Sequence, residues 1–193
     1  MTSETGLPLK AHIHRRTEIY QSRHFAFVTE DLTLPNGRRT EMAMVRHPGS
    51  IGVVPLFGDG RVLMEHQYRH CVRDYLLEIP AGTLEPGESP LACAGRELEE
   101  ETGHTATEFI ELGRTHILPV YSDEVIHLFL ACGLTPTRAR LDPDEIIDTR
   151  IYPLDRLMDM IVAGEITDAL SVLALQRAWF YLRSRNGLRD RPR

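Results

Sequence analysis

Short apolar runs separated by turn residues fill the first eighty positions of the chain. Residues 17–46 predict two or three strands, because apolar and polar residues alternate on either side of a turn at Pro35–Gly37. The runs IGVVPLF and RVLMEHQYR follow, on either side of the tight-turn sequence at residues 58–60. We therefore predict an N-terminal hairpin unit, a second hairpin, and one more short strand in YLLEIP.

The middle and the end of the chain contain segments with a helical period. A helix is predicted to begin at Ser89, a favourable N-cap followed by Pro90 in the first helical position, and to stop at Gly103. Strands are predicted over residues 107–117, 125–132 and 145–154. Apolar residues then recur at helical spacing in residues 154–162 and 169–180, which predicts two amphipathic helices that close the chain.

The composition narrows the class of protein. With 193 residues, of which 42% are hydrophobic and 26% charged, the chain is expected to form one globular domain with an N-terminal extension. A formal net charge of −6 argues against nucleic acid as a partner, because phosphate contacts need clustered basic residues. The sequence contains no apolar run of membrane-spanning length, and its three cysteines show no metal-binding or redox spacing. We therefore expect a cytoplasmic protein that binds neither membranes nor nucleic acid.

Four glutamates crowd the end of the first predicted helix. Helical geometry puts Glu97, Glu100 and Glu101 on one side, whereas Glu99 points elsewhere. Like charges at this spacing cost roughly a few tenths of a kcal/mol per pair, and they stand at the helix end where the dipole disfavours anions. On charge alone two interpretations stay open: an exposed acidic face, or a site for a hard cation such as Mg²⁺ or Mn²⁺.

A longer pattern surrounds these acids. Gly82 is followed after five residues by Glu88, and after seven more by Arg96 and the run ELEEETG, which ends at Gly103. This spacing resembles the Nudix hydrolase signature at every fixed polar and glycine position. The sequence departs from the signature at His104, where the family usually has an apolar residue.

Shorter segments resemble one branch of that family, the ADP-ribose pyrophosphatases. They are EHQYRH at 65–70, YLLEIPAG at 75–82, Pro119, and GEITDALSVLAL at 164–175. The resemblance implies an α/β (α+β) fold, a Nudix α/β/α sandwich with a mixed sheet and an N-terminal β-hairpin extension. Residues 1–46 would form that extension and exchange strands within a homodimer, and residues 47–193 would form the hydrolase domain.

The resemblance also implies a metal site. Glu97 and Glu101 would be the main ligands of Mg²⁺ or Mn²⁺, with Glu100 as a third acidic and catalytic participant. The backbone carbonyl of Ala81 would complete the inner site, and Arg96 would hold one of the glutamates in place. The metal would neutralise a diphosphate and lower the pKa of a bound water, so that hydroxide attacks phosphorus.

A carboxylate on a loop after the signature often assists as the base in this branch. The matching loop is LPVYSDEV, in which Glu124 is the first candidate and Asp123 the second. Val120 and Tyr121 stand where the branch commonly has a Pro-Gly pair. The base therefore stays open between Glu124, Asp123 and a signature glutamate, and a polar turn before the strand at 125–132 is the alternative for this loop.

Three polar residues are candidates for binding the substrate. Arg69 is placed to contact a diphosphate, because its guanidinium offers a fork of donors to phosphate oxygens. By resemblance, Glu78 and Glu85 would contact a ribose or position Arg69. A surface pair at a strand end is the alternative for each of the three. The candidates for stacking on the adenine are Tyr20, Phe25 and Phe27.

The activity that the resemblance implies is the Mg²⁺-dependent hydrolysis of the diphosphate of ADP-ribose to AMP and ribose 5-phosphate. Two alternatives stay open. One is a pyrophosphatase for another nucleoside diphosphate sugar such as GDP-mannose, and the other is a non-catalytic Nudix domain that senses ADP-ribose. The complete set of signature acids favours an enzyme over a sensor.

Overall fold

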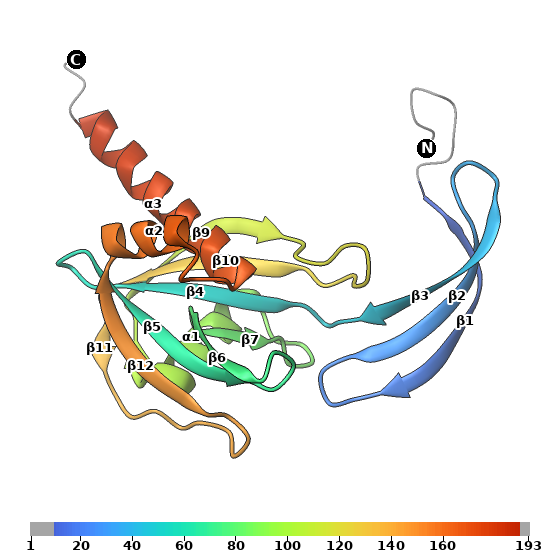
Figure 1. Ribbon diagram of the computed structural model, residues 1–193, viewed down its shortest axis with the longest axis horizontal. Helices are drawn as coiled ribbons and strands as arrows, with labels where there is room; N and C mark the ends of the chain where they lie inside the picture. Colours follow the sequence, from blue (N-terminus) through green and yellow to red (C-terminus); the bar gives the residue numbers. More distant parts are fainter. Residues whose placement is uncertain (1–9, 190–193) are drawn as a thin grey trace. The chain divides into compact units, whose positions relative to one another are not determined.

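The structure, a computed structural model, describes residues 10–189 and divides into two compact units (Figure 1). The smaller unit comprises the chain up to Pro48 together with Leu118–Val125, and the larger unit comprises Gly49–Ile117 and the chain from Ile126 onward. The smaller unit thus takes in the predicted extension, of which residues 1–9 lie outside the described residues, and adds a second segment from far along the chain. Of the helices in the described part, none combines the length and apolar character needed to cross a membrane.

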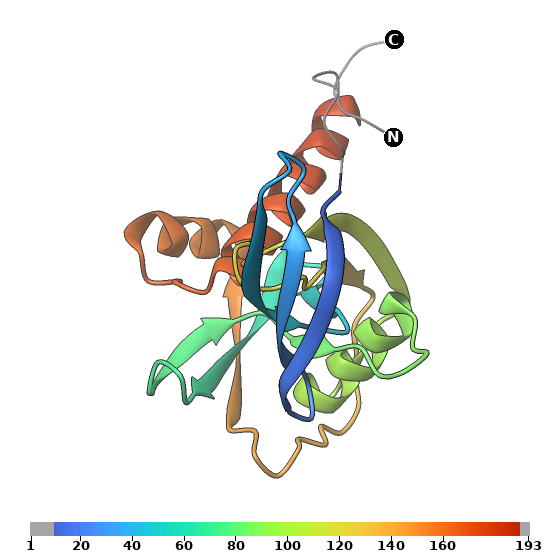
Figure 2. The same cartoon turned by 90° about the vertical axis from the view of Figure 1, so that its right-hand side faces the viewer.

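Within its described residues the smaller unit contains a three-stranded antiparallel sheet of β1 (His12–Gln21), β2 (Ala26–Thr33) and β3 (Arg39–Arg46), with β2 in the centre (Figure 2). Residues of β2 alternate between buried and partly exposed, with Val28, Glu30 and Leu32 buried. This alternation follows from the pleat of a strand. The polar member of the buried row, Glu30, accepts a hydrogen bond of 2.7 Å from Nε of Arg16.

A seven-stranded mixed sheet is the centre of the larger unit within the described residues. The main order is β12 (Ile147–Pro153), β5 (Arg61–Arg69), β4 (Ser50–Leu56), β10 (Ile126–Cys132) and β9 (Glu108–Thr115). β6 (Asp74–Glu78) pairs with β5, and β7 (Ala81–Thr83) pairs with β4. β4 and β10 run parallel while their other partners run antiparallel, and a separate pair joins β8 (His104–Thr105) to β11 (Thr135–Pro136).

Helices cover both faces of this sheet (Figure 1). α1 (Pro90–Thr102) packs through Cys93, Ala94 and Leu98 on one face. α2 (Leu154–Ala163) and α3 (Ala169–Arg189) pack on the other. The central strand β4 serves both layers, because alternate residues of a strand point to opposite faces. The predicted mixed sheet between helices is confirmed.

The predicted bounds of α1 are confirmed by its caps. Oγ of Ser89 accepts a hydrogen bond from the backbone N–H of Ala92, and Pro90 stands in the first turn. At the other end Gly103 has a φ of 64°, and its N–H donates to the carbonyl of Glu99. A Cβ at Gly103 would lie 2.8 Å from the backbone nitrogen of Ala139, so both conformation and space require glycine there. These caps fix which glutamates of the helix face the sheet.

Candidate active site

The segment from Gly82 to Gly103 brings the backbone of β7 against α1. β7 pairs antiparallel with the start of β4, where Gly82 lies opposite Ile51. A Cβ on Gly82 would lie 1.9 Å from Oε1 of Glu97. Glycine is therefore required at residue 82 for the Glu97 carboxylate to reach this strand.

Arg96 connects three glutamates of the segment. Its Nε and Nη2 donate to the two oxygens of Glu88, each at 2.9 Å. Its Nη1 donates to Oε1 of Glu97 at 2.8 Å and to Oε2 of Glu100 at 3.2 Å. The guanidinium lowers the pKa of Glu88 to about 2, and these partners raise the pKa of Arg96 above its usual value. Through one planar group, Arg96 thus fixes the position of Glu88, which precedes the helix, relative to Glu97 and Glu100 on the helix.

Glu97 and Glu101 lie one helical turn apart and are largely removed from water. Burial raises the pKa of Glu97 to about 7, although Arg96 acts in the opposite direction. Glu101 is 4% exposed, and its Oε2 accepts a hydrogen bond of 3.1 Å from the backbone N–H of Ala81. Burial first, and then the charges of Glu65 and Glu97, raise the pKa of Glu101 well above its usual range. A positively charged group that binds beside these two side chains would therefore stabilise their ionised forms.

Two more carboxylates face each other on the neighbouring strands β5 and β6. Glu65 and Glu78 are directly opposed in the antiparallel ladder, and both are buried. Arg69 donates to Glu78 through Nε at 3.0 Å and through Nη2 at 2.6 Å. Burial, followed by the charge of Glu78, raises the pKa of Glu65 to about 8. The predicted pair of Arg69 and Glu78 thus stands beside a second acid, Glu65, which was not among the predicted site residues.

Glu145, in the segment before β12, is the other acid that sequence reasoning missed. Its charge raises the pKa values of Glu65, Glu97 and Glu101, so it lies within electrostatic reach of all three. The sequence offered a signal for Glu65, which interrupts the apolar run of β5 at a position that the alternation would bury. For Glu145 no local signal exists, because the nearby Asp142 and Asp144 are acidic as well and no spacing distinguishes it from them.

The donor set of this acidic region fits a hard divalent cation. Four carboxylates, those of glutamates 65, 78, 97 and 101, interact within it, while Arg69 and Arg96 supply two positive charges. Such oxygen donors are the ligands that Mg²⁺ and Mn²⁺ prefer. As the side chains of the described residues stand, no three His, Cys, Asp or Glu groups already form a metal centre. Arg96 holds Oε1 of Glu97, so a cation at this oxygen would compete with Arg96.

Glu85 and Glu99 lie at the edge of this region. Glu85 is exposed on the turn that leads to α1, and its backbone N–H donates to Oε2 of Glu88. Its predicted contact with a ribose stays a prediction. Glu99 points away from the acidic cluster, as helical spacing predicted, and its Oε2 lies 4.0 Å from Nη2 of Arg140.

The two base candidates on the loop after the signature, Asp123 and Glu124, belong to the smaller unit. Asp123 accepts a hydrogen bond of 2.9 Å from the backbone N–H of His47 and pairs with Nε of Arg46 at 3.0 Å. Oε1 of Glu124 lies 3.5 Å from Nδ1 of His47. The segment that carries both acids is thereby held against the end of β3, and their role as base stays a prediction. The predicted stacking residues of this unit are all exposed, and they are Tyr20, Phe25 and Phe27.

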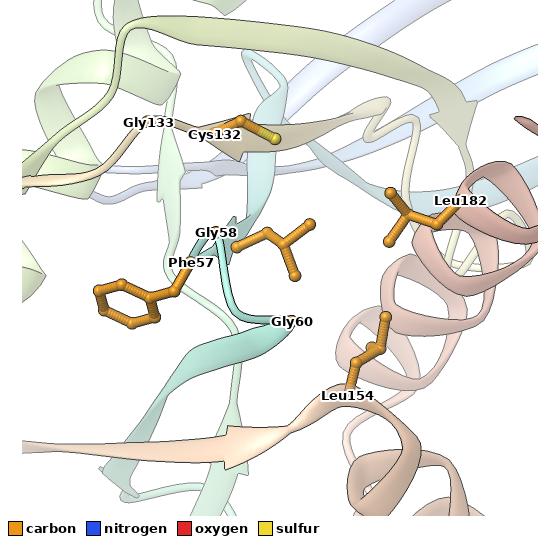
Figure 3. Close-up of a pocket in the computed structure, with 8 residues that line it drawn as sticks. Phe57, Gly58, Gly60, Cys132, Gly133, Leu154 and Leu182 are labelled. Carbon is orange, nitrogen blue, oxygen red and sulfur yellow. The ribbon is translucent and has the colours of Figure 1, made fainter. Parts of the chain in front are cut away.

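An apolar cavity of about 310 Å³ in the larger unit has a different character (Figure 3). Phe57, Leu154 and Leu182 line it together with Cys132 and three glycines. Its lining contains none of the acids described above. This cavity lacks the charged groups that a diphosphate or a divalent cation requires, so the acidic region is the better candidate site.

Comparison with known families agrees with this geometry. Residues 46–170 match the family model described as the NUDIX domain. The chain therefore belongs to the Nudix family and is a Nudix hydrolase, as the spacing between Gly82 and Gly103 indicated.

Individual relatives have similar lengths. The ADP-ribose pyrophosphatase of Bacillus subtilis (strain 168) is 34% identical over 163 residues, which cover 83% of this chain and 88% of that protein. The methanol dehydrogenase activator of Bacillus methanolicus is 37% identical over 161 residues, covering 82% of this chain and 87% of that protein. A solved structure described as the crystal structure of ADP compounds hydrolase superposes with a TM-score of 0.79 at 25% identity, covering 91% and 96% of the two chains. The resemblance to the ADP-ribose pyrophosphatase branch is confirmed.

Proposed function

We propose that the protein hydrolyses the diphosphate of ADP-ribose, or of a closely related ADP compound, and releases AMP and ribose 5-phosphate with the help of Mg²⁺ or Mn²⁺. One observation carries the proposal: Glu97 and Glu101 project from the signature helix into a buried acidic region beside the backbone of β7. The similarity to an ADP-ribose pyrophosphatase supports the choice of substrate. When bound, the cation would neutralise the diphosphate and lower the pKa of the attacking water.

Glu97 and Glu101 are the proposed main ligands, with Glu100 and the carbonyl of Ala81 beside them. The raised pKa values of Glu97 and Glu101 support this role, because a cation removes the repulsion and the burial penalty that their ionised forms carry. Arg96 is the positioning group, since it contacts both Glu97 and Glu100.

Arg69 is proposed to bind the diphosphate. Its Nε and Nη2 are engaged with Glu78, which leaves Nη1 of the fork to turn toward a phosphate oxygen. The arginine side chain is 42% exposed while that of Glu78 is 5% exposed, so the pair presents its cationic end to solvent. Glu78 therefore positions Arg69, and Glu85 is proposed to contact the ribose.

The base is proposed to be one of four carboxylates. Glu124 and Asp123 follow from the family resemblance, and Glu100 belongs to the signature helix. Glu145 joins them on structural grounds, because its charge reaches the other acids of the site. Replacing each by its amide separates them, since removal of the base lowers kcat and abolishes the acidic limb of the pH–rate profile, whereas removal of a bystander leaves that limb in place.

Release of AMP from ADP-ribose, with and without Mg²⁺ or Mn²⁺, tests the proposal. The folded variants Glu97→Gln and Glu101→Gln should lose at least about 100-fold in rate, the upper end of what the loss of an outer-shell partner of a metal costs. Glu99→Gln is the matched control, because Glu99 is a signature-helix glutamate that points away from the cluster. Full metal-dependent activity in both cluster variants would reject the proposal.

The same assay separates the other candidate functions. If the protein is a pyrophosphatase for another nucleotide sugar, a panel of substrates that includes GDP-mannose should show a higher kcat/KM for that sugar than for ADP-ribose. The similarity to a methanol dehydrogenase activator favours a second candidate, a regulator that binds an ADP compound. Tight binding of ADP-ribose without turnover, with either metal present, would support that candidate over the enzyme.

We further propose a homodimer formed through the N-terminal strands. The three-stranded sheet of the smaller unit exposes large apolar side chains, among them Ile13, Ile19 and Met42, which would favour a protein partner. Light scattering should give twice the chain mass for the natural protein and a lower mass for Ile19→Asp. A monomer for both would reject the dimer.

The free cysteines at 71, 93 and 132 support the expected cytoplasmic location.

A further inference from the structure

Glu65 is buried in the centre of β5 with no hydrogen-bond partner. Its side chain is 0% exposed, and within the described residues both of its carboxylate oxygens lack a partner. Buried polar groups are almost always satisfied, because an unpaired group loses its bonds to water without replacement. A carboxylate in this position therefore requires an explanation that packing does not supply.

The surroundings of Glu65 are mostly negative. Glu78 lies directly across the β5–β6 ladder, and the charges of Glu97, Glu101 and Glu145 also act on this region. Arg69 is the cation that acts on Glu65, but it is held by a two-point hydrogen bond to Glu78. The Glu65 carboxylate thus stands among acids, without a bond to the guanidinium group beside it.

Protonation alone would not satisfy this side chain. A neutral carboxyl group still has a carbonyl oxygen that accepts hydrogen bonds, and neither oxygen of Glu65 receives one from a donor among the described residues. An apolar residue of similar volume would remove the problem, since such replacements of buried charges are often neutral or stabilising. The presence of glutamate therefore points to a partner that the protein chain does not provide.

We propose that Glu65 is a further acidic group of the divalent-cation site, binding the cation or one of its water ligands together with Glu101. Hard cations keep several waters when they bind proteins, and each water donates two hydrogen bonds to neighbouring acceptors. The unpaired oxygens of Glu65 are such acceptors, and the site extends from the signature helix to β5. The inference rests on the cation site of the proposed function, and adds to it a residue outside the signature.

Titration of the full-length, metal-free protein with Mn²⁺ tests this role without any measurement of activity. Glu65→Gln keeps the size of the side chain and should weaken Mn²⁺ binding by about 10-fold to 100-fold, the range found for partners of metal ligands. Glu99→Gln, which changes a signature-helix glutamate beside Arg140, should leave the affinity within about twofold. In a chelator, thermal unfolding of Glu65→Gln should remain a single cooperative transition, which shows that the variant is folded.

The outcomes separate this inference from the proposed function. If Glu97→Gln loses Mn²⁺ affinity while Glu65→Gln retains it, the role of Glu65 is wrong and the site on α1 stands. If neither variant changes the affinity, the proposed cation site itself is wrong. Glu65→Asp serves if the glutamine variant does not fold, since it keeps the charge but withdraws it by one methylene. It should bind Mn²⁺ more weakly than the natural protein, and unchanged affinity would overturn the inference.

Discussion

Burial of Glu97 should make the metal-free protein less stable as the pH rises. Burial raises the pKa of this carboxyl from the ordinary 4.5 to about 7 in the folded protein. Between these two values the folded state binds more protons than the unfolded state, so the free energy of unfolding falls with increasing pH. The stabilising effect of the neutral form is complete below pH 4.5 and lost above about pH 7.

The size of this effect follows from the two pKa values. A difference of one between folded and unfolded pKa corresponds to about 1.4 kcal/mol. The interval from 4.5 to about 7 therefore corresponds to about 3 kcal/mol for Glu97. The side chain is only 12% exposed, so screening by solvent reduces this figure little.

Comparison with Glu97→Gln isolates this contribution, because the amide does not ionise and Arg96 keeps its bonds to Glu88 and Glu100. Urea unfolding in a chelator, followed by the fluorescence of the single tryptophan, gives both free energies as the pH rises from about 4.5 to about 8. The variant should gain about 3 kcal/mol relative to the natural protein over this range. A difference that stays constant with pH, or falls, would refute the reasoning.

Three further substitutions test the local structure. Gly82→Ala places a Cβ 1.9 Å from Oε1 of Glu97, so Mn²⁺ affinity should fall by about 10-fold to 100-fold in a folded protein, and unchanged binding in a titration would contradict the geometry. Ser171→Ala removes the acceptor of the buried Ile79 N–H, and urea unfolding should show a loss of about 1–3 kcal/mol. Ser89→Ala removes the N-cap of α1 and should lower the free energy of unfolding in urea by about 1 kcal/mol. An unchanged free energy would contradict this prediction.

The sequence determined the features that depend on neighbouring residues. Ser89 and Gly103 set the ends of α1, and the helical repeat then decided that Glu99 would point away from Glu97. The Gly82 spacing identified the family before any contact was known. These predictions succeeded because capping, helical period and signature spacing are local properties of the chain.

Only the tertiary structure decided which acids share one buried region. Glu65 and Glu78 meet through the β5–β6 ladder, and Glu101 reaches them from a helix more than twenty residues further along the chain. Glu145 joins from the segment before β12, where the nearby Asp142 and Asp144 are acidic as well and no spacing distinguishes it from them. Strand pairing and the packing of α1 on the sheet bring these residues together. Such contacts depend on the burial of the whole core, so no local rule of spacing could have predicted them.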